Sequence, residues 1–275
     1  MTQAFDPKDM LLMVAMHTTG SFVPQFVHAL TRLTAQLPIW GVRHAVCIVE
    51  DSLVDRGRDK AVAAMLDGDF THLLFLDVDI SFEPDDVMRL MAAQKPLVAG
   101  AYRQRNDSGR FAVSFLPGLG GKVPWDAEAQ VMQVDAAGTG FMLIERGVFE
   151  TMRSASPELA YQVENEDGSL SRLHGFFLQG IVDGQRVTED ILFCRRWRAL
   201  GGEVWVLPGV RLGHWGRQQY QGMLLEHLTF ARDTPVLDEP RDPVPAAEAG
   251  DAGEPAPSGA GATVVEAKGQ GPAGD

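Results

Sequence analysis

The sequence predicts an α/β fold in which helices flank a doubly wound, mostly parallel sheet. Apolar runs of strand length alternate along the chain with segments whose apolar residues recur at helical spacing. One run, from Leu73 to Leu76, is apolar at every position, which is typical of a strand buried on both faces. The repeated strand–helix–strand order favours parallel neighbours joined by helical crossovers.

The elements of this pattern can be assigned in order. Gly68 suits the end of one helix, and Pro84 followed by Asp85 and Asp86 suits the start of the next, because acidic side chains stabilise a helix N-terminus. The expected strands are 11–17, 43–50, 72–77, 96–102 and 203–208, with strand-like segments at 132–136 and 140–145. The expected helices are 21–37, 56–68, one from Pro84, a short one from Arg146 and 188–202, with a loop region around 155–186.

The composition changes near Asp233. Residues 233–275 are rich in Ala, Pro and Gly, and their acidic excess contributes −7 to the formal net charge of −13. A segment with so few large apolar residues cannot bury enough surface to offset its chain entropy. We therefore expect one folded domain over residues 1–232 and a disordered acidic tail over 233–275.

The bulk properties exclude several classes of function. An acidic chain lacks the basic surface that nucleic acid or an anionic membrane requires. The two cysteines, Cys47 and Cys194, form neither a disulfide framework nor a zinc pattern, which favours a reducing, cytoplasmic setting. No segment reaches the roughly 20 apolar residues of a transmembrane helix, and the first ten residues do not form a secretion signal.

Two aspartates, Asp77 and Asp79, follow the buried apolar run directly. Residues two apart on a strand point to the same side, so we expect both carboxylates to aim at one place. Like charges close together are costly without a cation between them, which predicts Mg²⁺ or Mn²⁺ at the sheet edge where α/β folds bind ligands. A calcium loop is excluded, because Phe82 and Met88 occupy the positions that require Gly and Glu. Two alternatives stay open: an aspartate that caps the following turn, and a haloacid-dehalogenase-type phosphatase with Asp77 as nucleophile.

Two further motifs carry reactive side chains. The segment Thr188–Glu189–Asp190 suits a helix N-terminus, and a carboxylate there also suits a general base. His214 lies between glycines after a strand and is either structural or a metal ligand, since imidazole joins carboxylates at Mn²⁺ sites.

Two other segments suit contact with a ligand. The stretch Gly138–Thr139–Gly140–Phe141 is either only a tight turn or a place where backbone approaches a ligand closely. Arg56, Arg58 and Lys60 lie just after the second strand, either as a solvated helix start or facing a phosphate-bearing ligand.

The order of these motifs resembles that of a GT-A type glycosyltransferase and is similar to family 2 nucleotide-sugar enzymes. The resemblance covers roughly residues 10–225 and rests on "LLFLDVDISFEPDDVMRLM", "AGTGFMLIERGVFETM" and "TEDILFCRRWRALGGEVWVLPGVRLGHWG". It implies a GT-A (Rossmann-like) fold, a nucleotide-diphosphate sugar donor, most simply a UDP- or GDP-sugar, and a glycan or other hydroxyl acceptor. It also implies a manganese or magnesium ion.

The resemblance also implies roles for single residues. Asp77 matches the position that contacts the nucleotide ribose or shares the metal, while Asp79 and His214 match metal ligands. Asp190 matches the catalytic base of inverting enzymes, with Glu189 supporting it. The donor-binding positions that it implies are His17, Arg58, Asp77, Gly138, Thr139 and Gly140.

The chain departs from the processive members of that family. Their Q-x-x-R-W signature does not follow the TED segment, and no membrane helices are expected, which favours a non-processive enzyme that adds one sugar. A catalytically silent sugar-nucleotide or glycan-binding module is the alternative from another class. The presence of Asp77, Asp79, Asp190 and His214 argues against it, because a binding module needs no base.

Overall fold

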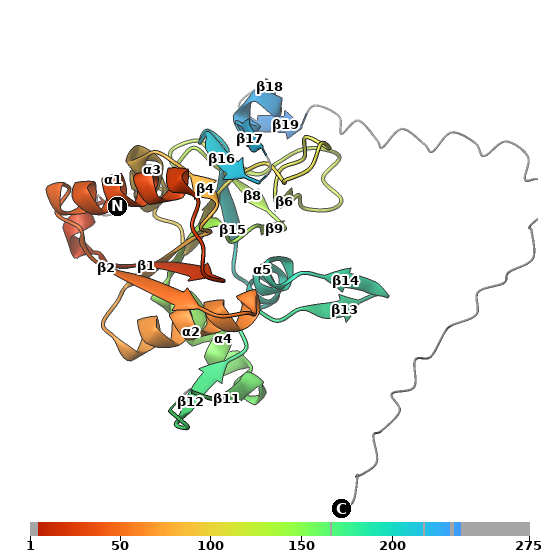
Figure 1. The fold of residues 1–275 in the computed structure, drawn as a ribbon. Coiled ribbons are helices and arrows are strands. Elements are labelled where there is room, and N and C mark those ends of the chain that lie inside the picture. The colour runs from red at the N-terminus through yellow and green to blue at the C-terminus, as the bar shows by residue number, and fades with distance from the viewer. Residues whose placement is uncertain (1–4, 166, 217, 232–233, 238–275) are drawn as a thin grey trace, which may run out of the picture. The chain divides into compact units, whose positions relative to one another are not determined.

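An eight-stranded mixed sheet runs through the computed structural model, which describes residues 5–165, 167–216, 218–231 and 234–237 (Figure 1). Strands β2, β1 and β3 are parallel neighbours, as are β5 and β15, while β10, β8 and β7 each run antiparallel to their neighbours. The α/β prediction is therefore confirmed, but the sheet is mixed and not mostly parallel as expected, because β10, β8 and β7 run antiparallel to their neighbours. The strands, in spatial order, are β2 (Arg43–Glu50), β1 (Leu11–Thr18), β3 (His72–Leu76), β10 (Phe141–Glu145), β5 (Leu97–Gly100), β15 (Val204–Leu207), β8 (Val131–Val134) and β7 (Trp125–Asp126).

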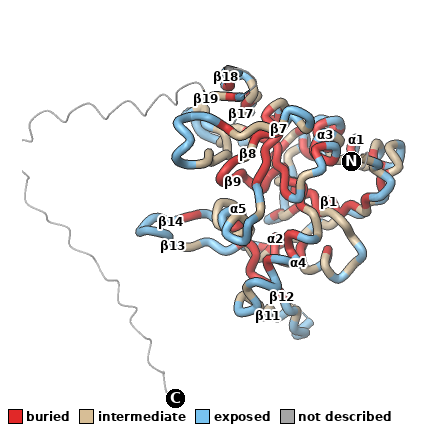
Figure 2. Tube along the Cα trace, turned by 180° about the vertical axis from the view of Figure 1, so that it is seen from behind, coloured by how far each residue is buried: buried red, intermediate tan, exposed pale blue. Residues whose placement is uncertain are grey.

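Helices cover both faces of this sheet, as Figure 1 shows. Side chains of β1 alternate between the two faces: Leu12, Val14 and Met16 pack with α1 and α3, whereas Met13 and Ala15 pack with α2 and α4. Figure 2 shows the central strands as the most deeply buried part of the chain. The helices are α1 (Pro24–Ile39), α2 (Val54–Asp67), α3 (Pro84–Ala92), α4 (Arg146–Ala155) and α5 (Glu189–Ala199), with 3₁₀ turns at Pro7–Asp9, Pro157–Leu159 and Leu224–His227.

Helix α2, which will carry part of the site, is held by charged side chains near both ends. Just before its N-terminus, the carboxylate of Asp51 binds Arg56 and Lys60 at 2.6 and 2.7 Å. Beyond its C-terminus, the guanidinium of Arg146 donates to the carbonyls of Met65, Leu66, Gly68 and Phe70. Carbonyls at a helix end have no partner within the helix, and a cation there also favours the helix dipole.

The predicted loop region 155–186 contains two β-hairpins, so the prediction that this region lacks strands was wrong. These strands have three to five residues each, and most of their side chains are exposed or only half-buried, so the apolar pattern along them is short and weak. The hairpins are β11–β12 (Ala160–Glu164 and Leu170–His174) and β13–β14 (Gly180–Val182 and Gln185–Val187).

The chain near the predicted tail boundary also forms strands. Residues 234–237, which the sequence assigns to the tail, form β19 (Thr234–Leu237) and pair with β18 (Leu228–Ala231). The rest of the predicted tail, 238–275, lies outside the described residues. None of the helices in the described ranges is long and apolar enough to cross a membrane.

Several small sheets of two or three strands accompany the central sheet. The one that matters for the site has the order β17–β16–β4, with β4 (Ile80–Ser81), β16 (Leu212–Trp215) and β17 (Gln219–Gly222). Because β4 starts directly after the two aspartates, its pairing with β16 brings His214 next to them. A second pair joins β6 (Val113–Ser114) to β9 (Ala136–Ala137).

Candidate functional site

Asp77 and Asp79 lie in a turn beyond the end of β3, not on the strand itself. The strand ends at Leu76, and the amide of Ile80 donates to the carbonyl of Asp77 at 3.0 Å. The argument that residues two apart on a strand share a side was therefore wrong for this pair. The turn separates the two carboxylates, and each of them has a different cationic partner.

Asp77 is paired with a buried arginine. Nη2 of Arg58 lies 3.2 Å from Oδ1 of Asp77, and Nη1 lies 2.8 Å from Oε1 of Glu189. Arg58 is 5% exposed. Burial alone would lower its pKa, but the charges of Asp77 and Glu189 outweigh that effect and raise it. The guanidinium thus joins the end of β3 to the start of α5.

The neighbouring residue, Asp59, binds the backbone at Phe176 and Phe177, and the Phe177 ring packs against Arg58. Its carboxyl accepts hydrogen bonds from the amides of Phe176 and Phe177 at 3.0 and 3.1 Å and from the Tyr161 hydroxyl at 2.9 Å. The Phe177 ring centroid lies 5.8 Å from the Arg58 guanidinium carbon. Burial is the main influence on Asp59 and raises its pKa to about 7.

Asp79 faces His214 and Arg105. Oδ2 of Asp79 lies 3.6 Å from Nε2 of His214 and 2.6 Å from Nη1 of Arg105. Nδ1 of His214 lies 2.7 Å from the carbonyl oxygen of Arg103, so Nδ1 carries the proton and donates it. The lone pair of a neutral ring is then on Nε2, directed towards Asp79. Burial would raise the pKa of Asp79, but a hydrogen bond and positive charge from His214 in its protonated form, together with the charge of Arg105, outweigh that effect and lower the pKa.

The Gly138–Phe141 stretch packs closely against Asp77. The amide of Asp77 donates to the Gly140 carbonyl at 2.9 Å, and the amide of Gly140 donates to the Tyr102 hydroxyl at 3.2 Å. A Cβ on Gly140 would lie 2.8 Å from Oδ2 of Asp77, and one on Gly138 would lie 2.2 Å from the Tyr102 hydroxyl oxygen. These glycines lie close to Tyr102 and Asp77, and their predicted approach to a ligand stays a prediction. Whether Thr139, which is fully buried, contacts a donor remains a prediction.

Glu189 and Asp190 begin helix α5, as the sequence predicts. Glu189 is bound by Arg58, whereas Asp190 accepts from the Thr188 hydroxyl and from the amide of Ile191 at 2.8 Å. The negative charge of Asp190 acts on both Arg58 and Tyr102. Asp190 is half-buried, so its carboxylate stays accessible, whereas the carboxylate of Glu189 is held by Arg58.

The remaining predicted residues have internal partners. Nε2 of His17 lies 2.6 Å from the carbonyl oxygen of Asp51, and its ring fills the space beside Gly57. Arg56 and Lys60 both bind Asp51, so neither is a free cation for a phosphate. Of the basic cluster, Arg58 is the member that reaches Asp77.

The donor set fits a divalent ion with two protein ligands. Asp79 and His214 are a carboxylate and an imidazole whose far nitrogen is oriented by a carbonyl, which is the usual support of a metal-bound histidine. No group of three His, Cys, Asp or Glu side chains suited to a metal occurs within the described ranges. Asp77, which was also expected to share the metal, is paired with Arg58 instead.

The sequence reading missed Tyr102 and Arg105. Both follow β5, the strand next to β10, at the same sheet edge as the aspartates. Their position after the fourth predicted strand was a usable signal, because the carboxyl ends of parallel strands meet at one edge.

Solved structures resemble this chain at low sequence identity. A197 from STIV shares 14% identity at a TM-score of 0.47, over 84% of this chain and 95% of that one. GalNAc-T7, in a structure with UDP, GalNAc and Mn²⁺, shares 12% identity at a TM-score of 0.41, over 76% of this chain and 44% of that one. A glycosyltransferase involved in glycosylation of the major capsid of PBCV-1 shares 9% identity at a TM-score of 0.29, over 54% and 67%. No protein-family model and no curated protein sequence matches the chain.

Proposed function

We propose that the chain is a metal-dependent, non-processive glycosyltransferase that moves one sugar from a nucleotide-diphosphate donor to an acceptor hydroxyl. The observation that carries the proposal is the orientation of His214. With Nδ1 donating to the Arg103 carbonyl, Nε2 is directed at Asp79, and the pair is ready to bind a cation. This pair lies at the carboxyl ends of the strands, where α/β sheets bind nucleotides.

Asp79 and His214 would hold Mn²⁺ or Mg²⁺, and the diphosphate of the donor suits the ligand positions that the protein does not fill. When bound, the ion acts as a Lewis acid that stabilises charge on the departing nucleoside diphosphate. Asp77 and the backbone at Gly140 form the adjacent wall, and the Asp77 amide is fixed by the Gly140 carbonyl.

Asp190 is proposed as the general base of an inverting transfer. The acceptor oxygen bonds to the anomeric carbon as the bond from that carbon to the donor phosphate breaks, and the acceptor proton passes to the Asp190 carboxylate. A free Asp has a pKa of about 3.9, so it takes this proton late, and positioning supplies much of the rate. Glu189 is bound by Arg58 and would fix the helix start rather than take the proton.

The experiment that tests the proposal is a calorimetric titration of UDP, GDP, CDP and dTDP into the full chain, with and without Mn²⁺. We expect one nucleotide to bind, with an affinity that Mn²⁺ increases in the wild type but not in Asp79→Asn. Asp69→Asn, an exposed aspartate away from the site, is the matched control and should behave as wild type. The proposal is wrong if none of the four nucleotides binds with Mn²⁺ present.

A second experiment tests the base. For the nucleotide that binds, slow hydrolysis of its common nucleotide-sugars should be detectable with Mn²⁺. Asp190→Asn should lower that turnover by about 10²-fold or more while nucleotide affinity is kept. Wild-type turnover in Asp190→Asn would contradict the assignment of the base but leave the donor site intact.

A further inference from the structure

A cavity lies near the candidate metal pair, across the β17–β16–β4 sheet from the His214 side chain. It has a volume of about 660 Å³, within the usual range for small-ligand sites. In antiparallel strands, paired residues lie on the same face. Ser81 pairs with Gly213, and Gly213 with Gln221, so these face the cavity, whereas His214 pairs with Ile80 on the opposite face.

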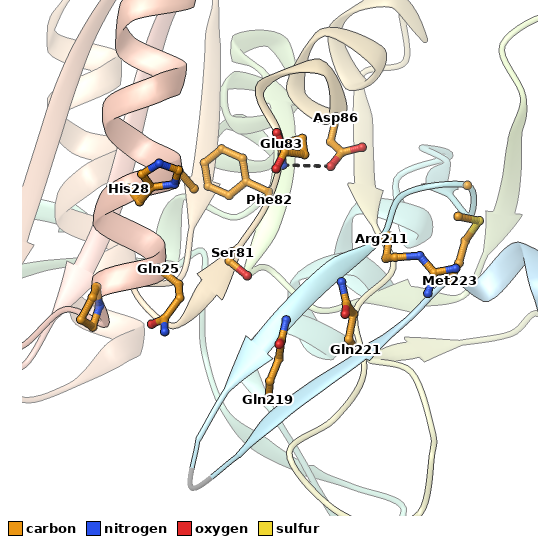
Figure 3. Close-up of a pocket in the computed structure, with 13 residues that line it drawn as sticks. Gln25, His28, Ser81, Phe82, Glu83, Asp86, Arg211, Gln219, Gln221 and Met223 are labelled. Atoms are coloured by element: carbon orange, nitrogen blue, oxygen red, sulfur yellow. Dashed lines mark hydrogen bonds between the residues drawn. The ribbon is translucent and has the colours of Figure 1, made fainter.

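The cavity is bordered by neutral hydrogen-bonding side chains from three separate elements (Figure 3). Gln25 and His28 come from α1, Ser81 from β4, and Gln219 and Gln221 from β17. The side chains of Gln25, His28, Gln219 and Gln221 are exposed and have no hydrogen-bond partner among the residues that the structure describes. Together they offer amide donors, amide acceptors and an imidazole to one opening.

The charged side chains that border the cavity are already paired. Arg211 binds Glu226, and Glu83 binds Arg32 at 2.6 Å. Asp86 accepts from the Glu83 amide at 3.1 Å and lies 3.9 Å from Arg89. A phosphate or carboxylate ligand would therefore have to compete with existing ion pairs, whereas a ligand rich in hydroxyl groups would find several unpaired amides among the described residues.

The cavity is connected to the candidate metal pair by hydrogen bonds. The amide of Trp215 donates to the Asp79 carbonyl at 2.8 Å, and its indole Nε1 donates to the Ser81 hydroxyl at 2.8 Å. A Cβ on Gly213 would lie 2.5 Å from the Ser81 hydroxyl and 2.6 Å from Nε2 of Gln219, so a larger residue here would displace both side chains from this wall. A ligand in the cavity would thus lie next to the candidate metal pair, across the small sheet from the His214 side chain.

We propose that this cavity binds a neutral saccharide unit of the acceptor, one that lies away from the hydroxyl that reacts. That the saccharide belongs to an acceptor rests on the proposed glycosyltransferase function. The saccharide site itself is supported by the unpaired amides and by the charged side chains that already have partners. It narrows the acceptor from any hydroxyl compound to a neutral oligosaccharide.

The test is binding of the full chain to an array of neutral and acidic oligosaccharides, followed by calorimetry with the strongest binder. We expect a neutral oligosaccharide to bind. The double variant Gln219→Ala/Gln221→Ala should weaken this binding at least about tenfold, since several hydrogen bonds are lost. Gln218→Ala is the matched control, because Gln218 is exposed, directly precedes β17 and does not border the cavity.

Three results would overturn the saccharide site: no binding to any neutral oligosaccharide, binding to acidic ones alone, or equal affinity in the wild type and the double variant. Nucleotide titrations on the same proteins separate this proposal from the proposed function. Oligosaccharide binding without nucleotide binding supports the saccharide site and contradicts the glycosyltransferase. Nucleotide binding without oligosaccharide binding supports the proposed donor site and contradicts the saccharide site.

Discussion

His214 and Asp79 face each other with Nε2 of the imidazole 3.6 Å from Oδ2 of the carboxylate. The imidazole also packs edge-on against the Tyr102 ring, with centroids 5.2 Å apart, so its position is set by packing as well as by the Arg103 carbonyl. Two potential ligands held this way before any cation arrives lose little freedom on binding it.

Replacing His214 with Phe should remove the effect of Mn²⁺ on nucleotide affinity. The ring would keep its packing against Tyr102 but would offer no nitrogen to the cation. Nucleotide affinity without metal should match wild type, and calorimetry with and without Mn²⁺ measures both. A Mn²⁺ effect of wild-type size in His214→Phe would exclude this histidine as a ligand.

Replacing Arg105 with Gln should strengthen Mn²⁺ binding, whereas replacing His214 should weaken it. Arg105 donates to the same Oδ2 of Asp79 that a metal would use, and its side chain is 52% exposed. Without it, Mn²⁺ should bind more tightly, by up to about fivefold, because an exposed ion pair is worth at most about 1 kcal/mol. Titration of free Mn²⁺ by electron paramagnetic resonance measures this. Weaker Mn²⁺ binding would instead show that Arg105 assists the site.

Replacing Arg58 with Met should destabilise the fold by about 3–5 kcal/mol, because it leaves Asp77 and Glu189 without their shared cation. Arg58→Lys should recover only part of this, since an ammonium is a point charge and cannot bridge both carboxylates as the guanidinium does. Denaturant unfolding gives the free energies. Arg105→Gln, which breaks an exposed pair, is the control and should cost less than about 1 kcal/mol. Equal losses in Arg58→Met and Arg105→Gln would contradict this account.

Gly138→Ala should destabilise the chain by about 1–3 kcal/mol, because the new methyl group would lie 2.2 Å from the Tyr102 hydroxyl oxygen. Adding Tyr102→Phe removes that oxygen and should return part of the loss. The two substitutions should thus be less harmful together than the sum of their separate effects, as a double-mutant cycle of unfolding free energies would measure. Strict additivity would rule out the contact as the cause.

Asp59 should make stability fall as pH rises from about 4 to 7. Its pKa of about 7 in the folded state lies above the unfolded value of about 3.9, so the native chain holds the proton in this window and the unfolded chain does not. The free energy of unfolding then falls by at most about 1.4 kcal/mol per pH unit through this group. Asp59→Asn should flatten the decline between pH 5 and 7, while Asp67→Asn, on the exposed face of the same helix, should keep it. Identical pH profiles for wild type and Asp59→Asn would contradict the prediction.

Local chemistry made several elements predictable from the sequence. The start of α3 at Pro84, with Asp85 and Asp86 in its first turn, and the end of α2 before Gly68 lie where the residue types suggested. The position of β10 between β3 and β5 was not predictable, because strand order depends on contacts far apart in sequence. That insertion makes the sheet mixed and places Gly140 beside Asp77.

The sequence predicted which residues belong to the candidate site better than it predicted the contacts between them. Residue type and order indicated Asp79, His214, Arg58 and Glu189, and the structure brings them together as two separate pairs. The pairing of Asp77 with Arg58 was not expected, because the turn after Leu76 is visible only in the backbone. Tyr102 was missed because a lone tyrosine carries no motif.

The two anchors of α2 have a consequence for how the site meets its ligand. Asp51 holds the start of this helix through Arg56 and Lys60, and Arg146 holds the carbonyls at its other end, so the helix cannot slide or tilt as a unit without breaking charged contacts. Arg58 lies on this helix between Arg56 and Lys60, so the same contacts fix the position of its backbone. A nucleotide bound at Asp77, as proposed, would therefore meet a guanidinium whose position is set by folding rather than by the ligand.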